Sequence, residues 1–294
     1  MHVFVTGATG FVGSRIVNIL LSRGHTVLAL ARNPAKAAVI ASKPGVTIHT
    51  GSLTDIESLK AGALAADGVI HTAFVHDFTQ YAANIAIDLE AIKAMVGVLK
   101  GTNKPFVSTS SPLLAGQDKV IIEIDPAKVM DMPTRGPAET FVLKSSDDGI
   151  RSSVVRLPIV HGENDPGFLT ILMNLAKQKN YVGYIESGTN HWPSVEVNDA
   201  ALLYVLALEK GTPGSVYHAI GEQGIEFREI ASAIAKKVGL EVKSIPKEEA
   251  GEYYGWFAAF AGFNFMASSE ITQKQLGWTP KGDGMVSEIG LYYS

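Results

Sequence analysis

The chain has no cysteine among its 294 residues. This absence excludes disulfide scaffolds, thiolate metal sites and cysteine nucleophiles. None of the eight histidines stands in an H-x-H or H-x-x-x-H pair, the spacings that bring two imidazoles onto one metal ion. We therefore expect no metal centre.

Basic charge and long apolar runs are also scarce. Lysine and arginine number 25 against 29 acidic residues, with no long run of like charge, whereas nucleic-acid binding needs a basic face. The longest apolar stretch, at 256–266, is shorter than the roughly 20 residues that cross a bilayer. The first residues do not follow the order of a secretory leader. We expect a cytoplasmic protein with no nucleic-acid or membrane partner.

What the chain does have, over residues 1–157, is an alternation of short apolar runs and amphipathic stretches. Runs rich in β-branched residues predict strands at 2–6, 26–31, 46–49, 68–73, 105–109 and 153–157. Helical spacing predicts helices at 11–23, 56–65, 81–100 and 138–144. This order favours right-handed βαβ units, and so an α/β fold with a doubly wound (Rossmann) parallel sheet.

The alternation changes near residue 158. Residues 158–195 are rich in glycine, asparagine, proline and aromatics, whereas 198–209 again predicts a helix and 216–220 a strand. We expect a dinucleotide-binding domain from 1–157 plus 197–221. A smaller C-terminal substrate-side domain would come from 158–196 plus 222–294. Pockets form preferentially between such domains.

A glycine fingerprint directly follows the first predicted strand. Gly7 allows a tight turn, Gly10 lets the backbone approach a pyrophosphate, and Gly13 lets the next helix pack closely on the sheet. The amino terminus of that helix offers N–H groups and a positive dipole end to phosphates. We expect the dinucleotide to contact the residues of this turn: Thr6, Gly7, Thr9, Gly10, Phe11, Val12 and Gly13.

The end of the second strand indicates which dinucleotide binds. A carboxylate there would bind the ribose 2′-hydroxyl of NAD, whereas an arginine accommodates the 2′-phosphate of NADP. This chain has Arg32, with Lys36 one turn later, and no acidic residue before Asp55. NADP(H) is therefore favoured, and NAD(H) is the alternative.

Further motifs follow the later strands. Residues 51–55 read G-S-L-T-D, 71–74 read H-T-A-F, 106–116 contain a serine-rich strand end, and 156–162 read R-L-P-I-V-H-G. With these motifs the chain resembles the short-chain dehydrogenase/reductase superfamily, in its extended, NAD-dependent epimerase/dehydratase-like branch. The resemblance implies an active-site serine at Ser111. It also implies cofactor contacts from Ser52, Leu53, Thr72, Ala73, Phe74 and Thr109.

The chain departs from that superfamily at the catalytic dyad. Its members normally carry Y-x-x-x-K on the helix after the serine strand, but no such motif occurs here. By position, Asp131 replaces the tyrosine and Arg135 replaces the lysine. The resemblance is therefore to an atypical member, in which Arg135 would hold the ribose or a substrate oxygen or would be a surface cation.

Other residues are candidates for proton transfer and substrate binding. Histidine titrates near neutral pH, and His76 follows a predicted strand at the sheet edge where ligands bind. His161 takes the place of a substrate-proximal tyrosine. The serine run at 110–111 would contact a substrate oxygen or satisfy its own loop. Expected substrate contacts are Ser110, Phe168, His191, Trp192 and Trp256.

Aromatic residues concentrate at 253–265, either as core of the smaller domain or as the wall of an apolar pocket. The leading hypothesis is an NADP(H)-dependent oxidoreductase that reduces a carbonyl or related group on a small apolar molecule. The alternatives are a dinucleotide-sensing binding protein without turnover and a non-redox isomerase or lyase. Monomer and homodimer both remain open.

Overall fold

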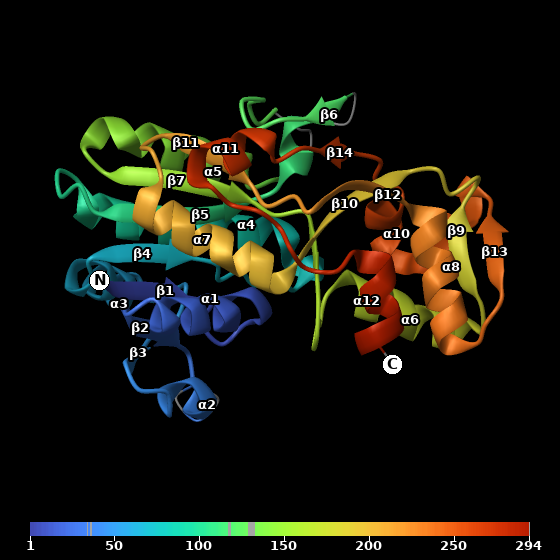
Figure 1. Ribbon diagram of the computed structural model, residues 1–294, viewed down its shortest axis with the longest axis horizontal. Helices are drawn as coiled ribbons and strands as arrows, with labels where there is room; N and C mark the ends of the chain where they lie inside the picture. The colour runs from blue at the N-terminus through green and yellow to red at the C-terminus, as the bar shows by residue number, and fades with distance from the viewer. Residues whose placement is uncertain (34, 36, 117–118, 129–132, 294) are drawn as a thin grey trace.

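The computed structural model describes residues 1–33, 35, 37–116, 119–128 and 133–293. Figure 1 shows two bodies side by side, a larger one built on a sheet and a smaller one that carries the C-terminus. Lys36 and Asp131, both named from the sequence, lie outside the described residues.

The larger body is built on a seven-stranded sheet whose registered pairs are all parallel. From one edge to the other the strand order is β11-β7-β5-β4-β1-β2-β3. The strands are β1 (His2–Thr6), β2 (Thr26–Ala31), β3 (Val46–Thr50), β4 (Gly68–His71), β5 (Pro105–Ser110), β7 (Arg151–Arg156) and β11 (Ser215–His218). The order reverses between β1 and β4, and ligands bind beyond the strand ends at such a switch point.

Helices cover both faces of this sheet (Figure 1). On one face α1 (Phe11–Ser22) packs against α7 (Val197–Lys210) over a buried apolar core. On the other face lie α3 (Ile56–Ala65), α4 (Tyr81–Leu99) and α5 (Gly136–Lys144), with a second core beneath them. A short helix, α2 (Ala38–Ala41), contacts β3. This arrangement confirms the doubly wound α/β fold predicted from the sequence.

The smaller body has its own apolar core, formed by residues of 169–192 and 225–293. Its strands are β8 (Ile159–His161), β10 (His191–Glu196) and β12 (Glu222–Glu226) in one sheet, and β9 (Val182–Ile185) and β13 (Val242–Ile245) in another. Its helices are α6 (Phe168–Lys179), α8 (Phe227–Val238), α9 (Ala250–Tyr254), α10 (Ala258–Ala261) and α12 (Met285–Tyr292). This separate core supports the two-domain division that we propose from the sequence.

One segment of the expected substrate-side domain returns to the larger body. Strand β14 (Met266–Ala267) pairs with β6 (Val120–Ile121), and α11 (Glu270–Leu276) contacts α7 and β11. Trp278 is buried in the core of the larger body, where its indole nitrogen donates to the carbonyl of Asp199. The two bodies are therefore joined by several crossings of the chain.

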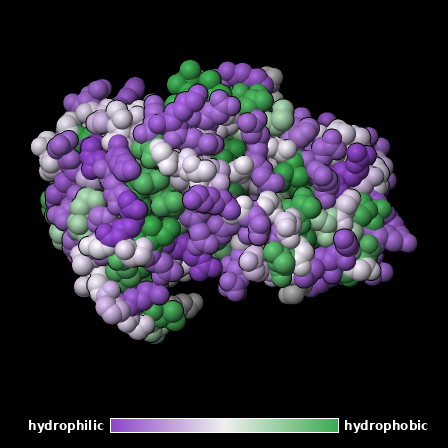
Figure 2. Space-filling view, in the orientation of Figure 1, coloured by the Kyte–Doolittle hydropathy of each residue, from purple (hydrophilic) through white to green (hydrophobic). Residues whose placement is uncertain are grey.

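The surface in view is mostly hydrophilic, with apolar side chains in separate patches (Figure 2). Among the described residues, no helix has the length and apolar character needed to cross a membrane.

Candidate functional site

The site begins at the turn between β1 and α1. Gly7 has a φ of +75°, a left-handed conformation that favours glycine, and its carbonyl accepts from the Gly10 N–H at 2.8 Å. A Cβ at Gly7 would lie 2.7 Å from Thr72 Oγ1, and one at Gly13 would lie 2.0 Å from the Gly7 carbonyl oxygen. The glycines therefore form a compact cradle at the amino terminus of α1, where first-turn N–H groups have no partner within the helix. A pyrophosphate fits this cradle.

A buried hydrogen-bond chain fixes the cradle to β4. Thr6 Oγ1 accepts from the Ala73 N–H at 3.3 Å and lies 2.7 Å from His71 Nδ1, and His71 Nε2 lies 3.1 Å from Asp88 Oδ1. All three contacts are satisfied if Thr6 donates to Nδ1 and Nε2–H donates to Asp88. Thr72 Oγ1 also donates to the Thr6 carbonyl. The Thr6 hydroxyl thus positions the turn from inside the protein.

Arg135 forms the last link of this series of hydrogen bonds, by pairing with Asp88. Its Nε and Nη2 donate to the two Asp88 carboxylate oxygens at 3.0 and 3.1 Å, a bidentate pair in which the Asp88 side chain is only 1% exposed. Burial favours the neutral acid, but Arg135 and His71 outweigh it and lower the pKa of Asp88. The guanidinium also lies 5.1 Å from the centre of the Phe74 ring. Arg135 is therefore an interior clamp, a role that the sequence comparison did not reveal.

His76 lies beside the same clamp. Its ring meets the Phe74 ring edge-on, with centroids 5.5 Å apart, while part of the residue remains exposed to solvent. Desolvation of the packed side of the ring, and then the charge of Arg135, lower the pKa of His76. The imidazole is consequently mostly neutral at pH 7.

The end of β5 brings hydroxyl groups to the next position along this edge. Thr109 Oγ1 donates to the His71 carbonyl and lies 2.7 Å from the Tyr204 hydroxyl, so it ties strands together rather than facing outward. Ser110 is buried, and its Oγ has no hydrogen-bond partner among the described residues. Ser111 is half-buried, and its Oγ accepts weakly from the Leu113 N–H at 3.4 Å. Ser111 thus has hydrogen-bonding capacity to spare for a ligand.

The other expected cofactor contacts also follow strand ends. Arg32 is exposed directly after β2. Ser52 and Leu53 are half-buried after β3, where the Ser52 hydroxyl contacts Thr54 Oγ1 at 3.0 Å. Thr9 and Gly10 are exposed in the glycine turn, whereas Phe11 and Val12 are half-buried at the start of α1. These placements put the expected contacts along one edge of the sheet.

The aromatic segment from the smaller body reaches this edge. Phe263 and Phe265 share an apolar cluster with Leu113 and Ala115, which follow Ser111 directly. The Phe260 ring lies 5.4 Å from that of Phe263 and 6.0 Å from that of Trp256, which is 52% exposed. Tyr253, Tyr254 and Phe257, in contrast, are buried in the core of the smaller body. The segment therefore serves both as core and as an apolar surface near Ser111.

Three of the expected substrate contacts lie in the smaller body rather than beside Ser111 at the sheet edge. Trp192 is 1% exposed and packs against Phe227 at 4.8 Å, so it is a core residue in this conformation. Phe168 packs among the aromatic rings of the same core. His191 is half-exposed and its backbone N–H donates to Asn264 Oδ1.

His161, a tentative catalytic residue from the sequence, is also buried. It is 1% exposed, and its Nδ1 forms a short contact with Glu288 of α12. The structure thus places this imidazole in an ion pair of the interior.

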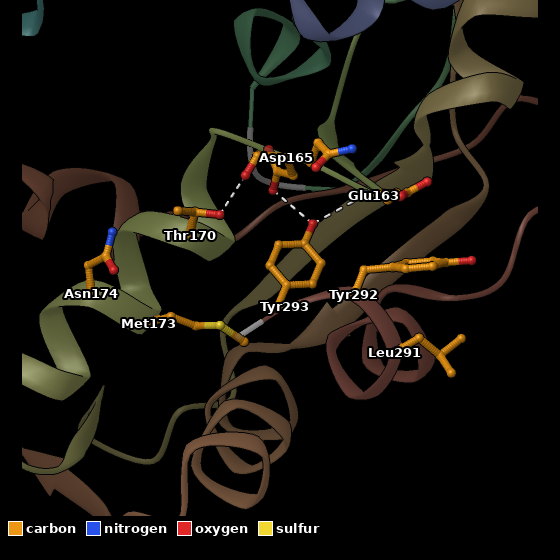
Figure 3. A pocket seen from close by; sticks show the side chains of 10 residues that line it. Glu163, Asp165, Thr170, Met173, Asn174, Leu291, Tyr292 and Tyr293 are labelled. Carbon is orange, nitrogen blue, oxygen red and sulfur yellow. Dashed lines mark hydrogen bonds between the residues drawn. The ribbon is translucent and has the colours of Figure 1, made fainter.

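A pocket of about 380 Å³ lies next to that ion pair, between the β8–α6 loop and α12 (Figure 3). The Tyr293 hydroxyl donates to Asp165 Oδ2 at 2.8 Å and accepts from the Gly162 N–H. Burial raises the pKa of Asp165 despite these contacts. None of the expected cofactor contacts lines this pocket. Within the described part of the chain, no group of three acidic or histidine side chains could hold a metal ion.

Comparisons with known proteins agree with this architecture. The model of the NAD dependent epimerase/dehydratase family matches residues 3–220. Uncharacterized proteins of Schizosaccharomyces pombe and Saccharomyces cerevisiae are each 43% identical, over 98% and 100% of this chain and 98% and 99% of their own lengths. A Stigmatella aurantiaca 4-hydroxy-2-methyl-3-oxo-4-farnesyl-3,4-dihydroquinoline-1-oxide ketoreductase is 26% identical over 85% of this chain and 78% of its own.

A similar solved structure is that of the dTDP-glucose 4,6-dehydratase DesIV from Streptomyces venezuelae with NAD and TYD bound. It has a TM-score of 0.80 and 18% identity, and the match covers 99% of this chain and 95% of that chain. At this identity the likeness shows the fold alone. The family model, which matches about three quarters of the chain, shows that the chain belongs to the NAD-dependent epimerase/dehydratase family.

Proposed function

We propose that the protein is an NADP(H)-dependent oxidoreductase that reduces a carbonyl or related group on a small apolar molecule. The observation that carries this proposal is the glycine cradle between β1 and α1, with Ser111 and an apolar aromatic surface on the same sheet edge. The cradle takes the pyrophosphate, and Arg32 would contact the 2′-phosphate. NADPH, when bound, supplies the hydride.

The chain's own residues would bind and orient the substrate. Ser111 offers a hydroxyl to the substrate oxygen, and His76 adds a second polar group beside it. The surface formed by Trp256, Phe260 and Phe263 would cover the apolar part of the molecule and exclude water. The Arg135–Asp88 pair ties α4 to the start of α5, and the His71–Asp88 contact ties α4 to β4.

The relatives support the substrate class. The Stigmatella relative is a ketoreductase whose named substrate joins a quinoline ring to a farnesyl chain. An apolar substrate suits an exposed indole and two half-buried phenyl rings.

The test is to mix the purified protein with NADPH and a panel of apolar ketones and to follow loss of the reduced nicotinamide's absorbance. We expect turnover that falls about a hundredfold or more in Ser111→Ala, in the range of a lost oxyanion contact. Ser187→Ala, an exposed serine of the smaller body, serves as the matched control. Tight NADPH binding without turnover on any ketone would favour a sensor or a non-redox enzyme.

A further inference from the structure

The sheet edge carries a tyrosine to which no role has yet been given. Tyr81 begins α4, and α4 follows the loop that leaves β4. Tyr81, Asn84 and Asp88 are spaced i, i+3 and i+7, so they share one face of the helix. Asn84 and Asp88 are buried on that face, whereas Tyr81 is half-buried at its upper end. Tyr81 therefore lies on the same face of α4 as Asp88, two helical turns before the residue that pairs with Arg135.

Tyr81 is surrounded by charged and titratable side chains as well as by an aromatic ring. Its ring lies 6.3 Å from the Phe74 ring, which also contacts the Arg135 guanidinium and the His76 imidazole. A cation and a phenol thus meet at one aromatic side chain, beside the β4 end of the cofactor cradle. The chain has no Y-x-x-x-K motif that could supply such a pair from one helix.

From this geometry we propose that Tyr81 is the catalytic proton donor, with Arg135 as the nearby cation. The inference rests on the proposed carbonyl reduction. NADPH, when bound, would supply a hydride to the carbonyl carbon and leave as NADP⁺, while the carbon–oxygen π bond breaks. Tyr81 would give its phenolic proton to the carbonyl oxygen, and solvent would return a proton to the phenolate.

The charges around Tyr81 agree with a donor. Burial raises the pKa of the phenol, Arg135 lowers it and Asp88 raises it, so the hydroxyl stays protonated at neutral pH while the cation stabilises the phenolate formed in the reaction. His76, in contrast, has a lowered pKa and carries no second proton near pH 7. Of these two groups, the phenol is therefore the better acid for the reaction.

Tyr81→Phe tests the inference, because it removes only the hydroxyl. With NADPH and an active ketone we expect the turnover number to fall at least about a hundredfold. A second measurement needs no turnover. Binding of the same ketone to the protein–NADP⁺ complex, followed by fluorescence, should weaken about fivefold, whereas the affinity for NADP⁺ itself stays unchanged. Tyr292→Phe, an exposed tyrosine of α12, is the matched control and should alter neither quantity.

The outcomes separate this inference from the proposed function. Wild-type turnover that persists in Tyr81→Phe, or unchanged ketone affinity in the NADP⁺ complex, would overturn the role of Tyr81 and leave carbonyl reduction standing. A wild-type protein that reduces no ketone would overturn both proposals.

Discussion

Single residues decide whether the cofactor cradle can form, and Gly13 is the clearest case. Its backbone φ is ordinary, but an added Cβ would lie 2.0 Å from the Gly7 carbonyl oxygen. The helix start and the turn would have to move apart. The requirement for glycine here is therefore one of close approach and not of backbone conformation.

We predict that Gly13→Ala lowers the free energy of unfolding by about 1–3 kcal/mol and weakens NADPH binding, because overpacking displaces the turn. Gly97→Ala is the matched control. Gly97 lies in α4, where a Cβ meets nothing within 4 Å, so the substitution should stabilise the helix by about 0.5–1 kcal/mol. Chemical denaturation and NADPH titration measure both effects. A Gly13→Ala protein as stable as the wild type would contradict the close-approach argument.

At this scale the sequence predicted the glycines well and the polar groups poorly. The G-x-x-G-x-x-G spacing is local, so it can be recognised without the fold. The partners of Thr6 are His71 and Asp88, which are distant in the sequence, and only the pairing of β1 with β4 brings them together. Asp88 lies within an apolar helical pattern, which indicates a buried carboxylate, but the pattern does not show which residue pairs with it.

Between elements, a second buried polar network joins α5, β7 and β11. Arg156 donates to both Glu139 oxygens, at 3.1 and 2.6 Å, and lies 3.3 Å from His218 Nε2. His218 Nδ1 lies 2.8 Å from the Ser268 carbonyl, so Nδ1 carries the proton and Nε2 accepts. Burial, and then the charge of Arg156, lower the pKa of His218 to about 4.

This pKa makes stability depend on pH in a defined direction. The unfolded imidazole titrates near about 6.5. Between that pH and about 4 the unfolded chain binds a proton that the folded protein does not, so the free energy of unfolding falls as the pH is lowered. The total effect is about 3 kcal/mol.

His218→Gln removes the titration and should give a flatter stability curve over the same range. Denaturant unfolding of both proteins at several pH values measures the difference. Parallel curves would show that His218 is not held neutral.

The elements themselves followed largely from periodicity. The strand predicted at 2–6 and the helix predicted at 56–65 match β1 and α3, because apolar spacing directly reflects which side chains are buried. The strand predicted at 68–73 ends earlier, at His71, since Thr72 and Ala73 bond to Thr6 and leave the ladder. The short strands β8, β9 and β10 carry no comparable pattern and were not predicted.

For the whole molecule, the doubly wound fold could be predicted from alternation alone, but the path of the C-terminal third could not. Residues 266–278 return to the larger body through β14, α11 and Trp278, and nothing local in their sequence distinguishes them from the segments around them. The candidate site, too, could be predicted only in part from local sequence. The strand-end motifs locate the sheet edge, whereas the clamp and the approach of Phe263 to Leu113 arise from tertiary packing.

The central claim is that this edge binds a dinucleotide, with NADP(H) preferred through Arg32. Fluorescence titration with NADPH and NADH tests it most directly, on the wild type, on Arg32→Asp and on the exposed control Arg228→Asp. We predict that the wild type and the control bind NADPH at least about tenfold more tightly than NADH, and that Arg32→Asp loses this preference, because it removes a charge-assisted contact to the 2′-phosphate. Failure to bind either nucleotide, or tighter binding of NADH by the wild type, would contradict the account.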